Sequence, residues 1–357
     1  MPDHEDVDAA TTFVACSGES WRNPFGMYAA LRDRDPVHHV EDADHWVLSR
    51  FDDVWGAARD TATFSSADGL TTTYGERELI GLDEARPIVM MDPPEHTAFR
   101  RLVASRFTPR RVASIEPMVR DWIGIRLDGL RGEEEVDVVE VLFKPLPSMV
   151  VAHFLGVAEQ DRDRFDGWTE AIVEANAQGN VTSAAEALRD LLGYFSELVE
   201  RRRVDPGDDV ISDLVGSTEV RDAAPLLQIL GFAFTMVAGG NDTTTGFLGH
   251  AAVELAGAPR QRAELVEDPS LIPDAVEELL RLASPVQGLA RTTTTDVTLH
   301  GRTIPAGRKV LLLYGSANRD PREFGADAEL LDVHRRIPRM MTFGYGAHHC
   351  LGAAVGG

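Results

Sequence analysis

The sequence is poor in cysteine and in basic residues. Two cysteines, Cys16 and Cys350, occur among 357 residues, which argues against a disulfide scaffold and is typical of a reducing cytoplasm. Acidic residues outnumber basic ones by 58 to 35, and the formal net charge is -23. Because phosphate recognition needs clustered Lys and Arg, this balance argues against a nucleic-acid partner.

Long hydrophobic segments are also lacking. The longest apolar stretch, 223–240, is interrupted by Gln228 and Thr235 and is followed by the polar run NDTTT, so it predicts a buried helix rather than a membrane span. The first residues, MPDHEDVDAATTF, lack the basic and apolar regions of a secretory signal. We therefore expect a cytoplasmic protein with no membrane partner.

Repeats, low-complexity tracts and long linkers are absent as well, so we predict a single domain over 1–357. Apolar residues recur with a spacing near 3.6 over most of the chain, which predicts a mainly α fold. The predicted helices are 24–34, 52–60, 94–107, 112–130, 146–154, 184–203, 223–255 and 273–282.

Strand signals are few and predict a small β-sheet region beside the helices. They lie at 38–40, 46–48, 297–300, 303–304 and 309–313. Strands do not alternate with helices, which disfavours a parallel α/β architecture. The glycines of GYGAHHCLG do not open a helix after an early strand, so they form no dinucleotide fingerprint.

The segment FGYGAHHCLG, 343–352, surrounds Cys350 with three glycines. Such a backbone can turn tightly and approach a bound group, and its amides can stabilise a metal-ligating thiolate. Taken alone, the pattern equally fits a buried inert thiol, and a zinc ligand or a nucleophile is a further alternative. Zinc would draw on His334, His348 and His349, but no second ligand pair has the spacing of a structural zinc site.

This segment matches the signature FGxGxHxCxG of the cytochrome P-450 family at every fixed position. The matching residues are Phe343, Gly344, Gly346, His348, Cys350 and Gly352. The sequence resembles this family along essentially its whole length. The resemblance implies a cytochrome P-450 fold, heme b (iron protoporphyrin IX) whose iron is held by Cys350, and monooxygenase activity with O2. A thiolate ligand favours O–O cleavage.

The segment AGGNDTTTG, 238–246, places glycines and polar residues inside an apolar helical stretch, where they are costly. It resembles the family's central helix, which crosses the distal face of the haem. The resemblance implies that Ala238 and Gly239 border the haem and that Asp242 and Thr243 relay protons. Alternatively, Asp242 and Thr243 only satisfy backbone groups in a kinked helix.

Two further motifs concern arginines and their partners. In EELLR, Glu278 and Arg281 are spaced i,i+3, as in many surface ion pairs. The resemblance implies a buried, structural pair that is joined by a later arginine, for which Arg335 is the candidate.

In MDPPEHTAFRRLV, His96 and Arg100 lie one helical turn apart. The resemblance implies that both contact the haem propionates together with Arg291 and His348. The alternative is that His96 and Arg100 are ordinary surface residues.

The sequence has no flavin or nicotinamide motif, so electrons are expected from an iron-sulfur ferredoxin and its NAD(P)H-dependent reductase. Two basic clusters could attract an acidic electron donor. They comprise Arg100, Arg101, Arg106, Arg110 and Arg111, and then Arg335, Arg336 and Arg339. Alternatively, these arginines bind propionates or cap helices.

By resemblance, the substrate pocket is walled by 65–89, 171–181, Val286 and Leu289. Their mostly apolar or small polar character favours a hydrophobic small-molecule substrate.

Relatives continue beyond the cysteine loop, whereas this chain ends seven residues after Cys350. We therefore expect a fold that lacks its usual C-terminal portion and has reduced stability. The alternative function is a catalytically impaired haem-binding or ligand-binding protein. A peroxide-driven peroxygenase ranks last, because the acid-alcohol pair is intact.

Overall fold

The computed structural model describes residue 13 and residues 22–76, 86–177, 185–217 and 224–356. The chain forms two compact units, which we describe separately. The first contains 1–80 and 254–350, and the second contains 81–253 and 351–357. The prediction of one domain stays a prediction.

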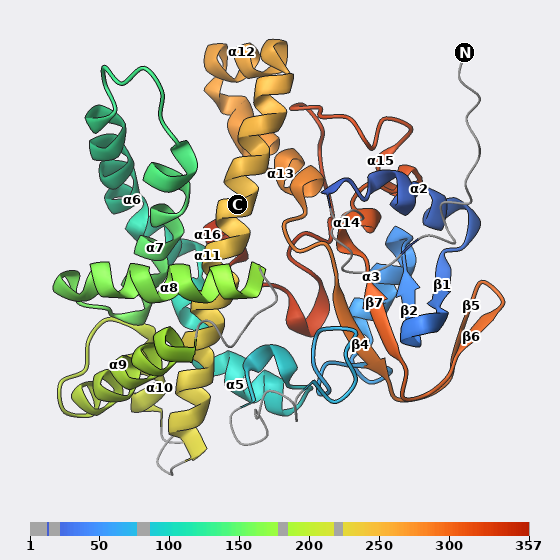
Figure 1. Cartoon of the computed structure of the whole chain (residues 1–357), viewed down its shortest axis with the longest axis horizontal. Helices are drawn as coiled ribbons and strands as arrows, with labels where there is room; N and C mark the ends of the chain where they lie inside the picture. Colours follow the sequence, from blue (N-terminus) through green and yellow to red (C-terminus); the bar gives the residue numbers. More distant parts are fainter. Residues whose placement is uncertain (1–12, 14–21, 77–85, 178–184, 218–223, 357) are drawn as a thin grey trace. The chain divides into compact units, whose positions relative to one another are not determined.

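The first unit is built on a five-stranded sheet that combines strands from an early and a late part of the chain. Its strand order is β1-β2-β7-β4-β3, and only β2 and β7 pair in parallel. Figure 1 shows the blue β1 and β2 beside the orange β7 and β4. The strands are β1 (Val37–Val40), β2 (His45–Leu48), β3 (Phe64–Ser65), β4 (Leu289–Thr293) and β7 (Lys309–Leu312), and a separate hairpin pairs β5 (Val297–Leu299) with β6 (Arg302–Ile304).

Short helices pack on both faces of this sheet. Leu48, Val310 and Leu312 share a core with Phe51 and Val54 of α3, whereas Val47 and Leu311 pack with Tyr28 and Leu31 of α2. The helices of this unit are α2 (Phe25–Arg34), α3 (Phe51–Arg59), α12 (Pro259–Glu267), α13 (Ile272–Ala283), α14 (Tyr314–Ala317) and α15 (Pro321–Phe324).

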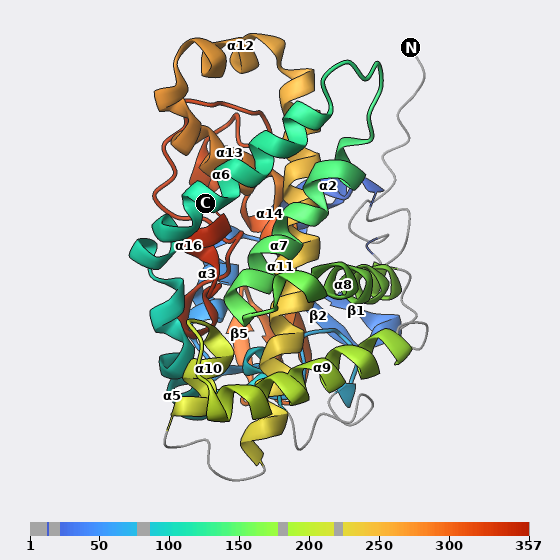
Figure 2. The same cartoon turned by 90° about the vertical axis from the view of Figure 1, so that its left-hand side faces the viewer.

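The secondary structure elements of the second unit are all helical within its described residues. Its core gathers apolar side chains from several helices, and the rings of Phe99 and Phe232 meet at 5.8 Å. In Figure 2, α7, α8 and α9 lie beside the long α11. The helices are α5 (Glu95–Val103), α6 (Pro109–Gly129), α7 (Pro145–Leu155), α8 (Arg162–Ala177), α9 (Ala185–Val204), α10 (Val210–Gly216), α11 (Ala224–Gly257, ending in the first unit) and α16 (Ala353–Gly356).

The predicted mainly α class with a small β region is confirmed. The predicted helix 94–107 was too long, because α5 ends at Val103 and a 3-10 segment, Ala104–Phe107, follows it. Six of the described helices and two of the described strands were not predicted. These are α8, α10, α12, α14, α15, α16, β3 and β4.

Candidate functional site

The cysteine loop is folded by two glycines and three backbone hydrogen bonds. Gly344 and Gly346 have φ of 63° and 75°, which is the left-handed region that favours glycine. The N–H of Cys350 donates to the carbonyl of Phe343 at 2.8 Å, and that of His349 donates to Gly346 at 3.1 Å. The N–H of Gly344 donates to Met341 at 2.8 Å. The backbone of Cys350 is therefore held at a fixed place in the loop.

Cys350 itself is exposed, whereas an inert structural thiol would be packed in the core. Gly352, two residues further, belongs to the second unit, where its carbonyl accepts the N–H of Val355 at 2.8 Å at the start of α16. Cys16 lies outside the described residues. An exposed cysteine on a glycine-rich loop can supply, once deprotonated, a ligand for a soft metal centre.

His348 is half-buried and lies within 3.2 Å of the Ser66 hydroxyl, measured from Nε2 to Oγ. Ser66 is fully buried, and it precedes the loop that leads away from β3. Because a partner on one ring nitrogen selects the tautomer, this contact orients His348. From the sequence, Ser66 was expected only as part of the pocket wall 65–89 and not as a partner of His348, which is 282 residues away along the chain.

Arg291 lies on β4 with 3% of its surface exposed. Its Nη1 donates to the carbonyl of Ala290 at 2.7 Å, and within the described part of the chain it takes part in no ion pair. A buried cation without an anionic partner is costly. A carboxylate ligand, such as a haem propionate, would remove that cost, so this residue fits the predicted cofactor.

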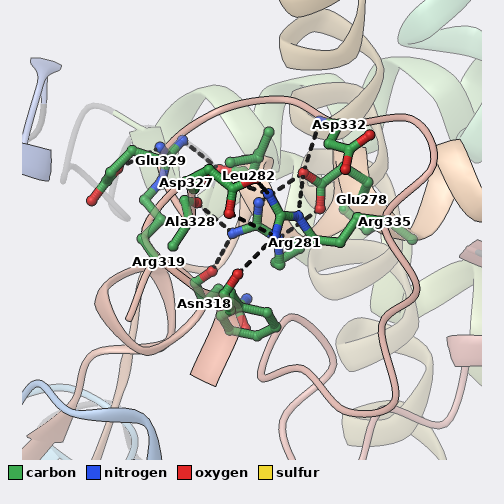
Figure 3. Close-up of polar contacts among 12 residues, drawn as sticks. Glu278, Arg281, Leu282, Asn318, Arg319, Asp327, Ala328, Glu329, Asp332 and Arg335 are labelled. Atoms are coloured by element: carbon green, nitrogen blue, oxygen red, sulfur yellow. Dashed lines mark hydrogen bonds and ion pairs between the residues drawn. The ribbon is translucent and has the colours of Figure 1, made fainter. Parts of the chain in front are cut away.

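Glu278 and Arg281 form a fully buried ion pair on α13, unlike the exposed pairs that share this spacing (Figure 3). Arg281 donates to the two carboxylate oxygens of Glu278 at 2.7 and 2.8 Å. Arg335 lies where the sequence predicts it and donates to Glu278 at 3.1 Å. The remaining Nη1 of Arg281 reaches the carbonyls of Asn318 and Ala328 at 2.6 and 2.7 Å. Arg335 also pairs with Asp327 at 3.1 Å, so two acids face the two arginines of this cluster.

The same network continues to the cysteine loop through Asn318, a residue that the sequence analysis missed. Its side-chain Nδ2 donates to Ser284 at 2.7 Å and to Thr342 at 2.9 Å. Its Oδ1 accepts the N–H of Met341 at 2.6 Å. Since Met341 and Thr342 directly precede Phe343, Asn318 fixes the point at which the loop begins.

In the second unit, His96 and Arg100 lie one turn apart on α5. His96 is 2% exposed and Arg100 is half-buried, so neither is an ordinary surface residue. Burial and the charge of Arg100 lower the pKa of His96. His96 is therefore a neutral hydrogen-bonding group at neutral pH.

The segment around Asp242 lies within α11, and side chains compete there for backbone carbonyls. The Thr243 hydroxyl donates to the carbonyl of Gly239 at 2.7 Å, and the Asn241 amide donates to Val237 at 2.8 Å. Such bonds back to the preceding turn weaken and bend helices. Burial raises the pKa of Asp242, which still keeps part of its carboxylate exposed. Asn241 was not singled out from the sequence, although the polar run contains it.

The two glycines of this segment differ in their surroundings. A Cβ added to Gly240 would lie 2.8 Å from Cγ2 of Val151 on α7, so Gly240 allows the two helices to approach. A Cβ on Gly239 would meet no described atom within 4 Å. Gly239, next to Ala238, therefore borders open space on α11.

Most arginines of the two predicted basic clusters are neutralised by acids. Arg106 pairs with Asp208 and Asp213, which raise its pKa. Similar pairs join Arg111 to Asp208 at 3.3 Å, Arg335 to Glu278 at 3.1 Å, Arg336 to Asp274 at 2.9 Å and Arg339 to Glu323 at 2.7 Å. Arg101 and Arg110 are exposed and in no ion pair with the described residues. The positive surface is therefore smaller than the sequence suggests.

The zinc alternative finds no ligand set in the described ranges, where no three His, Cys, Asp or Glu side chains gather around a metal position. His334 instead contacts Glu264 at 2.8 Å. Of the predicted pocket walls, 77–85 and 178–181 lie outside the described residues. None of the described helices combines the length and apolar character that crossing a membrane requires.

The chain is similar in sequence to one protein family and to several curated proteins. The family model "Cytochrome P450" matches residues 200–356. Cytochrome P450 130 of Mycobacterium tuberculosis is 59% identical over 351 residues, which cover 96% of this chain and 87% of that protein. Vitamin D(3) 25-hydroxylase of Pseudonocardia autotrophica is 37% identical over 95% of this chain and 84% of its own length.

Solved structures extend the similarity to the fold. The polyketide synthase cytochrome P450 PksS of Bacillus subtilis superposes with a TM-score of 0.86 at 31% identity, covering 96% of this chain and 88% of PksS. The structure of CYP109Q5 from Chondromyces apiculatus gives 0.83 at 34% identity over 95% and 86%. With identities this high over nearly its whole length, the chain belongs to the cytochrome P450 family and is a monooxygenase.

Proposed function

We propose that this enzyme inserts one oxygen atom from O2 into a hydrophobic small molecule, with heme b as cofactor and Cys350 as the iron ligand. The observation that carries the proposal is the exposed Cys350 on a loop whose backbone is fixed by Gly344, Gly346 and the carbonyl of Phe343. When bound, heme b supplies the activation of dioxygen, and a thiolate ligand favours O–O cleavage.

The remaining cofactor contacts follow from the charges of the site. Arg291 is a buried cation that needs an anion, and His96, Arg100 and His348 are further donors for propionate oxygens. The ring would lie against small or apolar residues that leave room for it. These are Phe343, Gly344, Gly346 and Gly352 on the cysteine side, and Ala238 and Gly239 on α11.

Asp242 and Thr243 would deliver protons. Burial raises the pKa of Asp242, so its carboxyl holds a proton at a higher pH than an exposed aspartate does. The Thr243 hydroxyl donates a hydrogen bond to the carbonyl of Gly239. Its oxygen lone pairs are therefore left to accept a hydrogen bond from a proton donor such as water. Together the two groups can pass protons one at a time without opening the site to bulk water.

Electrons would come from an iron-sulfur ferredoxin and its NAD(P)H-dependent reductase, because the sequence has no flavin or nicotinamide motif of its own. A hydrophobic substrate is supported by the names of related proteins, which include a vitamin D(3) 25-hydroxylase and a CYP109E1 in complex with testosterone. The share of the relatives that this chain covers gives no support to the catalytically impaired alternative.

The ferrous carbon monoxide difference spectrum tests the ligand. The parent is compared with Cys350→Ala and with Cys16→Ala, which removes the other cysteine as a matched control. We expect a red-shifted thiolate-type Soret band in the parent and in Cys16→Ala, and its loss in Cys350→Ala. The same band in all three proteins would rule out Cys350 as the ligand.

A titration of the ferric enzyme tests the substrate class. Testosterone should shift the Soret band in a saturable manner, whereas glucose should not. Turnover of the binding compound with a ferredoxin, its reductase and NADPH would then establish the electron source. Reduction that proceeds equally well without the ferredoxin would contradict that part of the proposal.

A further inference from the structure

The cysteine loop is stacked against α3 through one aromatic pair. The rings of Trp55, on α3, and Tyr345, in the loop, have centroids 3.6 Å apart and planes inclined by 21°. Tyr345 lies between the two left-handed glycines and five residues before Cys350. The contact therefore acts on the part of the loop that sets the path of the backbone.

The loop backbone also meets α3 directly. A Cβ added to Gly346 would lie 2.9 Å from the carbonyl oxygen of Ala58 and 3.2 Å from Cα of Arg59. Since a side chain at this position would collide with the backbone of α3, glycine allows the loop to pack closely against the end of α3. The stack of Trp55 on Tyr345 opposes separation of the two segments.

Trp55 is itself held in place by further contacts. Phe51 stacks on Trp55 with centroids 5.5 Å apart, and the Arg339 guanidinium lies 5.5 Å from the Trp55 centroid. Glu323 binds Arg339 through two hydrogen bonds of 2.7 Å. The start of α3 is fixed as well, because the N–H of Phe51 donates to Asp320 at 3.0 Å.

We propose that Trp55 is a positioning residue for Cys350. Its ring holds Tyr345, and the loop hydrogen bond from Cys350 to Phe343 transmits that position to the thiol-bearing residue. Without the stack, the segment 343–350 gains freedom to separate from α3, and the sulfur no longer has one preferred place. The inference rests on the proposed role of Cys350 as the iron ligand.

Hydrogen exchange on the full chain as purified tests the positioning step without relying on catalysis. The variants are Trp55→Ala and Trp55→Phe, and Trp46→Ala is the matched control, because Trp46 is a half-buried tryptophan that stacks on His39 at 4.5 Å in β2. In Trp55→Ala, amides of 343–350 should exchange about two- to tenfold faster, which corresponds to the loss of one aromatic pair. Trp55→Phe should restore most of the protection.

The result that overturns the proposal is equal exchange of 343–350 in the parent and Trp55→Ala, or an equal increase in Trp46→Ala, which would reflect general destabilisation. If Trp55→Ala does not accumulate as folded protein, Trp55→Leu keeps apolar volume without the ring and is judged by the same comparison.

The carbon monoxide spectrum tests the link to Cys350. The thiolate-type fraction should fall at least about twofold in Trp55→Ala and remain near the parent value in Trp55→Phe and Trp46→Ala. Faster exchange with an unchanged fraction would refute positioning of the ligand. If the parent shows no thiolate-type band, the proposed function fails, while the exchange data still decide whether Trp55 holds the loop.

Discussion

The side-chain oxygen of Asn318 accepts the backbone N–H of Met341 at 2.6 Å, in a place where both residues are fully buried. Through this bond, the segment that leads into the cysteine loop is tied to α13, because Arg281 donates to the carbonyl of the same Asn318. The ion pair of Glu278 with Arg281 therefore supports the loop across a single intervening residue.

Asn318→Ala should lower the free energy of unfolding by about 3 kcal/mol, because it leaves the N–H of Met341 and neighbouring hydroxyls buried without partners. Urea unfolding measures this loss. Gln261→Ala is the control, because Gln261 also joins two backbone groups, Leu331 and Val333, at 2.9 Å but not those of the loop. Both variants should lose stability, and only Asn318→Ala should also lose haem. Equal haem retention would contradict the link to the loop.

The two glycines of α11 should respond differently to alanine. Gly240→Ala should cost about 1–3 kcal/mol of unfolding free energy, because its Cβ collides with Val151. Gly239→Ala should be neutral or stabilising by about 0.5–1 kcal/mol, since alanine favours a helix. Urea unfolding distinguishes them, and Val151→Ala should relieve part of the Gly240→Ala cost in the double variant. Identical effects at both positions would show that the contact with Val151 is unimportant. Gly239→Ala should still weaken carbon monoxide binding, because its methyl group would enter the open space that Gly239 borders on α11.

The gain in stability from Asp242→Asn should grow as pH rises above the pKa of an unfolded aspartate, which is about 4. Burial raises the pKa of Asp242 in the folded chain above its unfolded value, so the parent binds a proton more tightly when folded. The stability that this tighter proton binding gives the folded parent is fully present below the unfolded pKa of Asp242. It is lost as pH rises through the folded pKa. Asparagine does not titrate and avoids the loss. Melting temperatures of both proteins at several pH values provide the measurement. A difference that does not change with pH would contradict the raised pKa.

Charge reversal should distinguish arginines that bind the electron donor from arginines that stabilise the fold. Arg110→Glu should slow reduction by ferredoxin about threefold or more and weaken its salt dependence, because Arg110 is exposed and in no ion pair with the described residues. Its unfolding free energy should change by less than about 0.5 kcal/mol. Arg106→Glu should instead cost about 2 kcal/mol or more, because it faces Asp208 and Asp213. Stopped-flow reduction and urea unfolding check both. Unchanged reduction in Arg110→Glu would exclude docking at this residue.

Helices with an apolar stripe could be predicted from the sequence, and those without one could not. The helix 273–282 corresponds to α13, where Leu279, Leu280 and Leu282 are buried. In contrast, α12 has no buried residue and therefore no apolar period to detect. The strand β4 was missed because four of its five residues are buried, so its Thr-rich sequence shows no alternation. For α8, the spacing of Phe165, Trp168 and Ile172 was a signal that went unused.

The residues of the candidate site also fall into two groups, those that a local sequence motif predicts and those that only the folded chain brings together. Cys350, Asp242 and the pair of Glu278 with Arg281 belong to local motifs whose spacing is visible in the sequence. Asn318, Ser66 and Trp55 act on the loop through contacts that join distant parts of the chain. The partner of Ser66 is 282 residues away, and that of Asn318 is 23. No local pattern encodes such contacts, because they depend on the completed fold.

The parallel pairing of β2 with β7 has a consequence for synthesis of the protein. The strand His45–Leu48 is complete 261 residues before its partner Lys309–Leu312 begins, counted from 48 to 309. At ordinary elongation rates, the early hairpin of β1 and β2 waits roughly 13 to 50 seconds for that partner. During this time its open edge is a template for pairing with other nascent chains. Slower expression, which lowers the concentration of nascent chains, should therefore increase the yield of folded enzyme. Co-expression of a chaperone that shields this edge should have the same effect.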